Sequence, residues 1–405
     1  MSKFEKMQID SSKDNPVIAK SNNTDAFGRA RVSDVNTIFD YNFSLINDFD
    51  LYWSELLTSG ATATHIPADA HYELAVTTTI GSKAILQSRR HMEYYTGKSH
   101  IGYFTGNPNS IQQGMRKRLG LFTGSQGYFF EITDTGAKAV VRKGGVDDVV
   151  ASANWNGDKL DGSGASGIST DENKQQLYFI DIAWLGSGQI RFGQVLNGGQ
   201  HIIVHTYQAG NSLTTPFTNT AVLPFRIEIE CIATAPVADK LQLTCFSYLY
   251  EGGKNAATRL RGWDSGVTSI TVNTTPKALF GGRVNPSNGE ASIIMSDAIM
   301  TLVSGNSEVR WQLLFNATIT SPTWVNETNS LAQSLSSPST TSYSGGFVAA
   351  SGYITVGGTG VIDLSKTDIV LGHGADGVFD TFLLVAETTS SNSKILIRVD
   401  WEEYS

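Results

Sequence analysis

Two short glycine patterns are the residues of this chain whose spacing most directly suggests a known chemistry. Residues 162–167 (GSGASG) and 372–377 (GHGADG) both match G-x-G-x-x-G. That pattern binds a dinucleotide only when it follows a strand and opens a helix whose N–H groups hold the pyrophosphate. The first lies in a polar loop, and the second is followed by the strand-like run 378–385. We therefore interpret both as turn glycines and predict no cofactor.

Metal binding needs clustered histidines, cysteines or carboxylates. His201 and His205 are four residues apart on an expected strand and so share a face, but no third ligand accompanies them. Carboxylates that could offer oxygens to calcium crowd the glycine-rich loop, although their spacing matches no EF-hand; they are Asp158, Asp161, Asp171 and Glu172. We predict interface or structural histidines, solvated turn carboxylates and no metal site, with calcium in the loop as the alternative.

Hydrolytic chemistry has no local signature in the sequence. The G-x-S-x-G elbow of serine hydrolases is missing, and the nearest string, 164–167, lacks its spacing. Carboxylates that are distant in sequence can still meet in space as a glycosidase pair. We predict that the protein is not an enzyme and has no catalytic residues, with a polysaccharide-digesting activity as the alternative.

The two cysteines, Cys231 and Cys245, lie in two alternating apolar runs. If residues 236–239 form the turn between these runs, the thiols fall nearly opposite each other on the apolar face. Because a protein made in the cytoplasm keeps its cysteines reduced, we expect reduced core thiols. A cross-strand disulfide is the alternative.

A docking segment is predicted near the amino terminus, within residues 25–33 (DAFGRARVS). Phe27 is an isolated large apolar residue in a polar region, and Gly28, Arg29 and Arg31 follow it. Aromatic and arginine side chains dominate the energy of protein interfaces, so this segment suits docking on a partner. The alternative is that it forms the first edge strand of a sheet. The denser basic spots, 89–90 and 116–118, are expected on outward strand faces.

Bulk composition limits the classes of protein to consider. A chain of 405 residues exceeds what one hydrophobic core usually organises, which favours two domains and an extension. The net charge of -8 makes nucleic acid an improbable partner, because phosphate binding rests on Lys and Arg. No apolar stretch approaches the length of a membrane span, and no signal peptide is visible, so we expect synthesis in the cytoplasm.

Apolar residues alternate with polar ones at period two almost throughout, as in residues 72–76, 225–231, 309–315 and 395–401. Short strands separated by turns predict an all-β protein of two β-sandwich, jelly-roll-like domains. Residues 142–173 are expected to form one long irregular insertion, and the Gly252-Gly253 doublet marks a linker. The expected organisation is an extended N-terminal arm at 1–45, a first β-sandwich at 46–253 and a second, smaller one at 254–405.

Four segments resemble a known group of proteins. They are residues 25–33 (DAFGRARVS), 155–167 (WNGDKLDGSGASG), 181–193 (DIAWLGSGQIRFG) and 223–228 (LPFRIE). These four segments resemble virion structural proteins of tailed bacteriophages and other large double-stranded DNA viruses. The resemblance covers roughly residues 14–250 and fades after that.

The resemblance implies a non-enzymatic component of a virus particle, such as a tail or collar fibre, a spike or a head decoration. Such a subunit would be made in the host cytoplasm and would work by self-assembly into a homo-oligomer, with a trimer favoured, and by docking on other virion proteins. The alternative is a receptor-binding or depolymerising protein that acts on host surface glycan. Neither nucleic acid nor membrane is expected as a partner.

Overall fold

The computed structural model describes residues 24–45, 49–109, 111–196, 198–253, 259–364 and 369–405. Within these ranges every strand pairing is antiparallel, and the only α-helix, α1 (Phe49–Tyr52), is a single turn. The 3-10 turns are η1 (Pro67–Asp69), η2 (Ser152–Asn154), η3 (Pro286–Asn288) and η4 (Pro338–Thr340). The prediction of an all-β fold is therefore confirmed. None of the helices in the described ranges has the length and apolar character that crossing a membrane requires.

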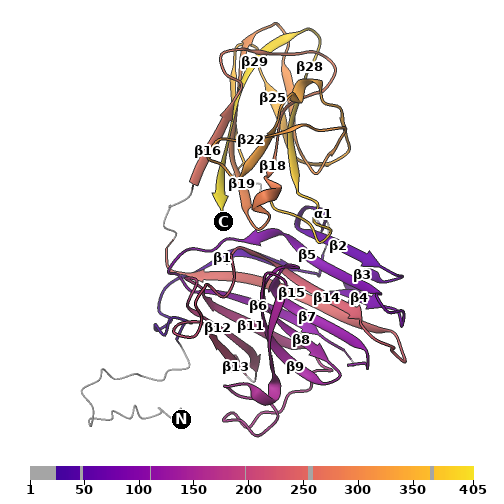
Figure 1. Ribbon diagram of the computed structural model, residues 1–405. Coiled ribbons are helices and arrows are strands. Elements are labelled where there is room, and N and C mark those ends of the chain that lie inside the picture. The colour runs from indigo at the N-terminus through magenta and orange to yellow at the C-terminus, as the bar shows by residue number, and fades with distance from the viewer. Residues whose placement is uncertain (1–23, 46–48, 110, 197, 254–258, 365–368) are drawn as a thin grey trace, which may run out of the picture.

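The first β-sandwich consists of an eight-stranded and a seven-stranded sheet (Figure 1). The eight-stranded sheet runs β13 (Gln200–Gln208), β12 (Gln189–Leu196), β11 (Gln176–Ala183), β6 (His100–Asn107), β15 (Asp239–Glu251), β4 (His71–Val76) and β3 (Thr62–Ile66), with β1 (Val35–Asn42) also paired to β15. The seven-stranded sheet runs β10 (Val146–Ala151), β9 (Gly136–Lys143), β8 (Gln126–Thr133), β7 (Met115–Phe122), β14 (Leu223–Cys231), β5 (Lys83–Met92) and β2 (Trp53–Thr58). Alternate side chains of both sheets fill the space between them.

Aromatic rings join the two sheets of this sandwich. Phe225 of β14 and Phe246 of β15 stack with their ring centroids 3.9 Å apart. Trp53 of β2 is fully buried and lies 6.2 Å from the Phe225 ring. Large rings bury much apolar area, so these contacts contribute strongly to holding the sheets together.

The N-terminal arm is shorter than the predicted 1–45. Residues 35–42 form β1, which pairs with β15 from Val35 opposite Glu251 to Asn42 opposite Cys245. Ile38, Phe39 and Phe43 are buried in the core of the first sandwich. These few apolar residues are enough to bury one face of β1, because a single short strand has only two or three side chains on its inner face. Residues 1–23 of the predicted arm lie outside the described residues.

Two further local predictions are wrong. Cys231 and Cys245 do not face each other across a hairpin, because β14 and β15 belong to opposite sheets. A bulge in β15 between Leu243 and Cys245 also turns the second thiol partly out of the core, and both cysteines are free. The expected irregular insertion at 142–173 begins with a regular strand, since β10 pairs with β9.

The second β-sandwich has two six-stranded sheets. One sheet runs β16 (Arg259–Asp264), β29 (Ser393–Tyr404), β19 (Ser292–Ser304) and β26 (Thr359–Asp363), with β17 (Ile270–Val272) paired to β29 and β27 (Val370–Leu371) paired to β19. The other runs β22 (Trp324–Asn326), β23 (Ala332–Leu335), β18 (Lys277–Val284), β28 (Thr381–Thr388), β20 (Val309–Phe315) and β25 (Phe347–Ile354). The short strands β21 (Thr318–Ile319) and β24 (Tyr343–Ser344) form a separate ladder.

The second sandwich stands on the first with its lower end against α1 and β5 (Figure 1). Leu51 of α1 packs against the core of the second sandwich. The rings of Tyr95 and Tyr404 meet edge to face across the same junction, 6.4 Å apart. Residues 254–258, where the second domain was expected to begin, are outside the described residues, so the exact boundary stays a prediction.

Candidate functional site

The junction between the sandwiches is built around an irregularity in β5. Between Pro224 and Arg226 of β14 the pairing with β5 jumps from His91 to Gln87, so Ser88, Arg89 and Arg90 have no partner in β14, although Ser88 still pairs with Trp53 of β2. Proline cannot donate to a ladder and is tolerated in a sheet at such a bulge. Bulges turn side chains in new directions, and this one directs Arg89 toward the second sandwich.

The loop 372–380 of the second sandwich packs against this bulge, and two of its glycines make the close contact possible. A Cβ on Gly372 would lie 2.4 Å from the Arg89 carbonyl oxygen, and one on Gly374 would lie 2.6 Å from Ser54 Oγ. Only glycine allows the two backbones to approach so closely. The second G-x-G-x-x-G pattern is therefore a docking loop between domains, and β28 follows it one residue after Asp380.

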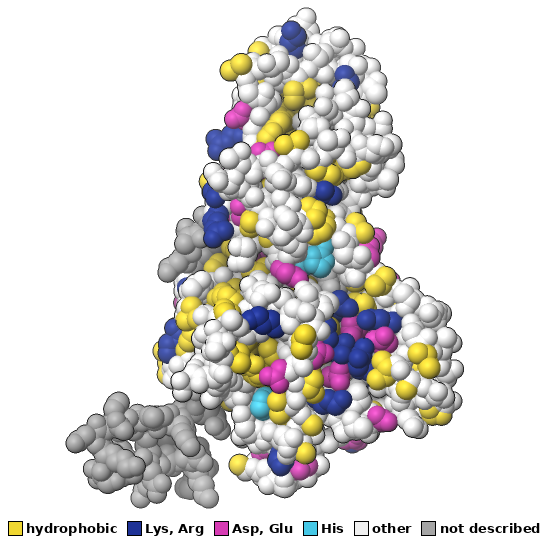
Figure 2. Space-filling view, viewed as in Figure 1, with side chains coloured by type: hydrophobic (Ala, Val, Ile, Leu, Met, Phe, Trp, Pro, Cys, Tyr) yellow, Lys and Arg dark blue, Asp and Glu magenta, His cyan; other side chains and the backbone are white. Residues whose placement is uncertain are grey.

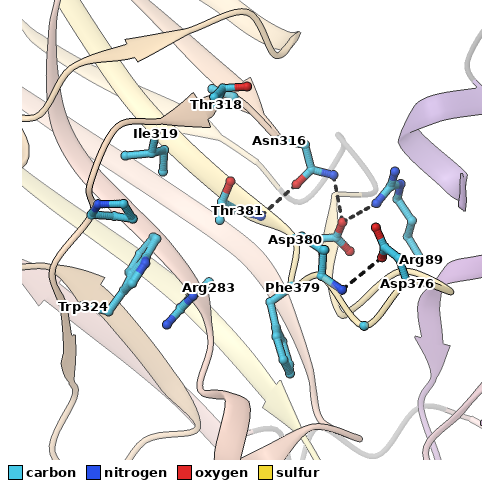
Figure 3. Close-up of a pocket in the computed structure, with 14 residues that line it drawn as sticks. Arg89, Arg283, Asn316, Thr318, Ile319, Trp324, Asp376, Phe379, Asp380 and Thr381 are labelled. Carbon is cyan, nitrogen blue, oxygen red and sulfur yellow. Dashed lines mark hydrogen bonds and ion pairs between the residues drawn. The ribbon is translucent and has the colours of Figure 1, made fainter. Parts of the chain in front are cut away.

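Arg89 and Asp380 form the central ion pair of the junction (Figure 3). Arg89 Nη1 donates to Asp380 Oδ1 at 2.7 Å, and Asn316 Nδ2 donates to the same oxygen at 2.8 Å. Arg89 Nε also donates to the Asp50 carbonyl at 2.8 Å. Burial raises the pKa of Asp380, and the opposing effect of Arg89 and Asn316 does not fully offset it. The pair therefore holds the two sandwiches together through a carboxylate that has no contact with solvent.

Beside this pair lies an open groove of about 560 Å³ at the lower end of the second sandwich. Figure 3 shows Trp324 and Arg283 on one side of it and Asp376 and Phe379 on the other. The Arg283 guanidinium lies 4.5 Å from the centroid of the Trp324 ring. A flat aromatic ring beside hydrogen-bonding groups can hold a sugar ring or an extended peptide.

The carboxylates of the groove already have structural partners. Asp376 Oδ1 accepts a hydrogen bond from the Val378 N–H at 3.0 Å, and Asp380 is held by Arg89 and Asn316. These bonds fix the positions of both carboxylates at the wall of the groove.

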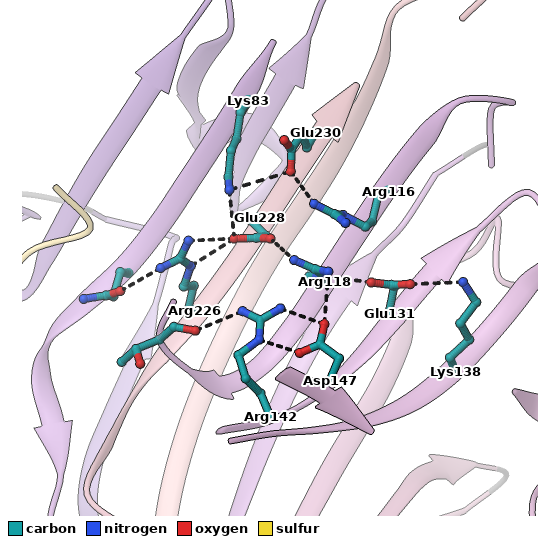
Figure 4. Close-up of polar contacts among 12 residues, drawn as sticks. Lys83, Arg116, Arg118, Glu131, Lys138, Arg142, Asp147, Arg226, Glu228 and Glu230 are labelled. Carbon is teal, nitrogen blue, oxygen red and sulfur yellow. Dashed lines mark hydrogen bonds and ion pairs between the residues drawn. The ribbon is translucent and has the colours of Figure 1, made fainter. Parts of the chain in front are cut away.

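The outer face of the seven-stranded sheet is a second polar site. Arginines and carboxylates from adjacent strands interlock across it, as Figure 4 shows, and they appear on the surface of the first sandwich in Figure 2. Arg118 of β7 contacts Glu228 of β14 and Glu131 of β8, each at 2.9 Å. Arg142 lies over the Phe129 ring at 4.9 Å, so the charged layer covers a small apolar cluster on this face.

This charged face accounts for the basic spot at 116–118. Arg116 and Arg118 point outward as expected, but Lys117 faces the interior, where it contacts Asp239 at 2.7 Å. Burial tends to raise the pKa of Glu228, yet Arg226, Lys83 and Arg118 together lower it to about 2. The carboxylate is thus firmly ionised, and its charge is satisfied within the chain.

The predicted docking segment folds back on the first sandwich. Asp25 accepts hydrogen bonds from the N–H groups of Phe27 and Arg29, which closes a turn, and Phe27 lies half-buried with Arg29 4.6 Å from its ring centroid. Arg31 contacts Asp181 at 2.8 Å and also pairs with Glu251. Gly28 and Arg29 are exposed. The segment is an ordered turn that lies against β11 and β12, where Gln189 and Arg191 donate to its backbone carbonyls, and Thr24 and Ala30 form only an isolated bridge.

The carboxylates of the glycine-rich loop shape the loop itself. Asp158 accepts the N–H groups of Leu160 and Ser166 at 2.9 and 2.7 Å. Asp161 and Asp171 make similar short-range bonds, while Glu172 accepts a hydrogen bond from the Tyr178 hydroxyl at 2.6 Å. A Cβ on Gly164 would meet the Asp158 carboxylate, so this glycine lets the loop close. In the described part of the loop these carboxylates bond to their own neighbours and do not converge on one point, so the contacts do not support calcium binding.

The expected pairing of His201 and His205 on one strand face is wrong. A bulge in β13 at Val204 shifts the alternation, so His201 contacts Tyr103 and Phe179 outside the core and His205 faces Phe192 inside it. Each ring has a hydrogen-bond partner. Asp380, Trp324 and His91 carry no local signal in the sequence, because each gains its role only beside residues from distant parts of the chain.

No family model matches this chain, and no curated protein matches it. Similar solved structures include a protein of unknown function from Shewanella oneidensis MR-1, at 10% identity and a TM-score of 0.37 over 56% of this chain and 91% of that chain. A glycosyl hydrolase family protein from Mycobacterium fortuitum is similar at 12% identity and a TM-score of 0.36, over 53% and 99% of the two chains. The CBM2 module of an evolved Dit of Lactobacillus casei BL23 phage J-1 is similar at 8% identity and a TM-score of 0.35, over 55% and 99%.

Proposed function

We propose that this protein is a non-enzymatic structural component of a tailed-phage virion, an appendage or accessory subunit that works by self-assembly and docking. It would be made in the host cytoplasm and reside in the particle as a homo-oligomer, with a trimer favoured. The motif resemblance suggests the particle, and the positions of the motif residues support the structural role.

The observation that supports this proposal is that charged side chains of two motifs pair with each other inside the first sandwich. Arg31 of the first motif and Arg191 of the hairpin motif both approach Asp181 of the hairpin motif, at 2.8 and 3.7 Å. Asp181 is 2% exposed, and Ser99 also donates to it. The motif residues thus tie the N-terminal turn to the sheet, which is a scaffolding role.

Phe27 and Arg29 are the residues that we assign to docking on a neighbouring subunit. Arg31 serves the subunit's own fold through Asp181 and Glu251. Arg29 also pairs with Asp25, but more than half of its side chain stays exposed and available to a neighbour. A partly buried aromatic ring beside an accessible guanidinium can gain both apolar contact and charge-assisted hydrogen bonds on association.

The direct test is to locate the protein in particles and to measure its oligomeric state. An antibody against the recombinant chain should label purified particles, and light scattering after size exclusion should give an oligomer. Phe27→Ala with Arg29→Ala should reduce incorporation, while the matched pair Val267→Ala with Arg259→Ala, exposed side chains of the second sandwich, should not. Particles that lack the chain would refute the proposal.

The second candidate is binding of host surface glycan in the groove beside Trp324. It rests on the exposed polar groove and its aromatic wall. A glycan array should then give binding that Trp324→Ala abolishes and that Phe347→Ala, an exposed aromatic elsewhere, retains. Release of oligosaccharides from host polysaccharide would instead indicate a depolymerase.

A further inference from the structure

Three side chains from separate parts of the chain converge at the junction of the sandwiches. His91 comes from the end of β5, Glu290 follows η3, and His373 belongs to the loop 372–380. Glu290 Oε2 lies 3.9 Å from His91 Nδ1 and 3.9 Å from His373 Nε2. One ligand atom from each residue falls within 4.8 Å of the others. Figure 2 shows histidine and acidic side chains reaching the surface at the waist between the two sandwiches.

The hydrogen bonding of this cluster is incomplete. His91 is fully buried, and neither of its ring nitrogens has a hydrogen-bond partner. Glu290 Oε2 is also buried without a partner. Leaving such groups unsatisfied is costly, and in native proteins an ion or an ordered water commonly completes them. His91 Nδ1 and Glu290 Oε2 face each other across 3.9 Å, whereas His91 Nε2 lies on the side of the ring next to Gly372.

The surrounding residues orient the three groups as ligands. Thr123 Oγ1 and Ser125 Oγ donate to Glu290 Oε1 at 3.0 and 3.2 Å, which leaves Oε2 directed toward the histidines. His373 Nδ1–H donates to the Gly374 carbonyl at 2.9 Å, so Nε2 carries the lone pair. Outer hydrogen bonds of this kind fix the tautomer and the direction of metal ligands.

The donor set determines which cation would fit. Two imidazoles and one carboxylate suit zinc and similar transition metals, whereas calcium and magnesium prefer oxygen ligands. Around a tetrahedral zinc ion neighbouring ligand atoms lie about 3.3 Å apart. Each histidine nitrogen would therefore move closer to Glu290 from its present 3.9 Å, and the two histidine nitrogens, which lie within 4.8 Å, would approach each other as well.

We propose that His91, Glu290 and His373 bind one divalent transition-metal ion, with zinc the best match, and that this ion ties the second sandwich to the first. His91 belongs to the first sandwich, whereas Glu290 and His373 belong to the second. The ion would therefore crosslink the domains at the point where Gly372 already brings their backbones together. Water can occupy the fourth position, because Glu290 is partly exposed.

The test uses the untagged full chain, stripped with a chelator and dialysed. Zinc titrated by calorimetry, with elemental analysis of the dialysed complex, should show about one ion per chain, and magnesium and calcium should not compete. His373→Gln and Glu290→Gln should each lower the affinity by at least tenfold, whereas His201→Gln should bind zinc like the native protein. Thr123→Val should weaken binding by about tenfold to a hundredfold and leave the stoichiometry at one.

Two readouts separate loss of the site from loss of the fold. Circular dichroism should show that His373→Gln and Glu290→Gln keep the native β spectrum, since both residues lie in loops and glutamine retains their hydrogen-bonding shape. Saturating zinc should raise the Tm of the native chain by several degrees and leave that of His373→Gln unchanged. Absence of zinc binding by the native chain, or native affinity in both folded variants, would overturn the proposal.

Discussion

Asp380 and Glu228 are both carboxylates buried against arginines, yet their pKa values shift in opposite directions. Burial raises the pKa of Asp380 because one arginine and one amide do not fully offset the loss of solvent. Three cations surround Glu228 and lower its pKa to about 2 despite the same burial. The number of cations around a buried carboxylate therefore decides whether its charge is favoured.

Removing the cation of the junction should be costly. Arg89→Ala leaves Asp380 buried without its ionic partner, and we expect a loss of about 3 kcal/mol in the free energy of unfolding. Asp380→Asn combined with Arg89→Ala should lose less than the sum of the two single changes, because the residues interact directly. Urea denaturation at pH 7 measures both. Arg310→Ala, which breaks a pair with Glu387 on the surface, is the control and should leave the midpoint close to the native one.

Glu228 makes the stability of the protein depend on pH. Its folded pKa of about 2 lies below the ordinary value of 4.5, so its contribution is fully present above pH 4.5 and is lost as the pH falls toward 2. That contribution is on the order of 3 kcal/mol. Glu228→Gln should therefore be destabilised at neutral pH, and the difference from the native protein should shrink between pH 4.5 and pH 2. A constant difference across this range, measured by denaturant titration, would contradict the assignment.

Among the elements, the loop 372–380 and the bulge of β5 work as a matched pair. The bulge exposes the Arg89 backbone and turns its side chain outward, while Gly372 allows the loop to lie against that backbone. Gln87 Nε2 then donates to the His373 carbonyl at 3.0 Å, and the Ala375 N–H donates to Ser54 Oγ at 3.1 Å. These two hydrogen bonds and the ion pair between Arg89 and Asp380 thus all depend on the close approach of Gly372 to the Arg89 backbone.

Gly372→Ala should weaken the contact between the two sandwiches, although it adds only one methyl group. The new Cβ would collide with the Arg89 carbonyl oxygen, a backbone atom that cannot move independently, so the loop must lift away. We expect a loss of about 1–3 kcal/mol and separate melting of the two sandwiches in differential scanning calorimetry. Gly253→Ala, where a Cβ meets nothing within 4 Å, serves as the control. A single unchanged transition in Gly372→Ala would argue against the loop as the coupling element.

At the scale of the whole molecule, two sandwiches form one unit in which the N-terminal segment takes two roles. Residues 25–31 make a turn that Arg31 attaches to Asp181 of β11, and β1 then enters the core. Any truncation that passes into β1 therefore removes core residues as well as the docking turn. A test of assembly has to separate these two effects.

Phe39→Ala should destabilise the first sandwich by about 3–5 kcal/mol, because it empties a buried aromatic position against Phe246. Deleting residues 1–40 should prevent stable folding for the same reason, since it removes Ile38 as well. Phe27→Ala alone should leave the urea midpoint within a few tenths of a molar of the native value and change only association. Arg29→Ala also removes the ion pair to the buried Asp25, so the double variant should lose some stability as well. Native stability in Phe39→Ala would mean that β1 is not a core strand.

The sequence alone determined the fold class, because the alternation of apolar and polar side chains is a local property that directly reflects one buried face. It also showed that neither glycine pattern sits between a strand and a helix. The tertiary structure decided which strands share a sheet and where a bulge changes the face on which side chains lie. The prediction for Cys231 and Cys245 was wrong because β14 and β15 belong to opposite sheets. The prediction for His201 and His205 was wrong because a bulge in β13 puts them on different faces. The meeting of Arg31 with Asp181, of Arg89 with Asp380 and of His91 with His373 joins segments far apart in the chain. Such contacts depend on strand order and on how two domains dock, and no local pattern in the sequence encodes either.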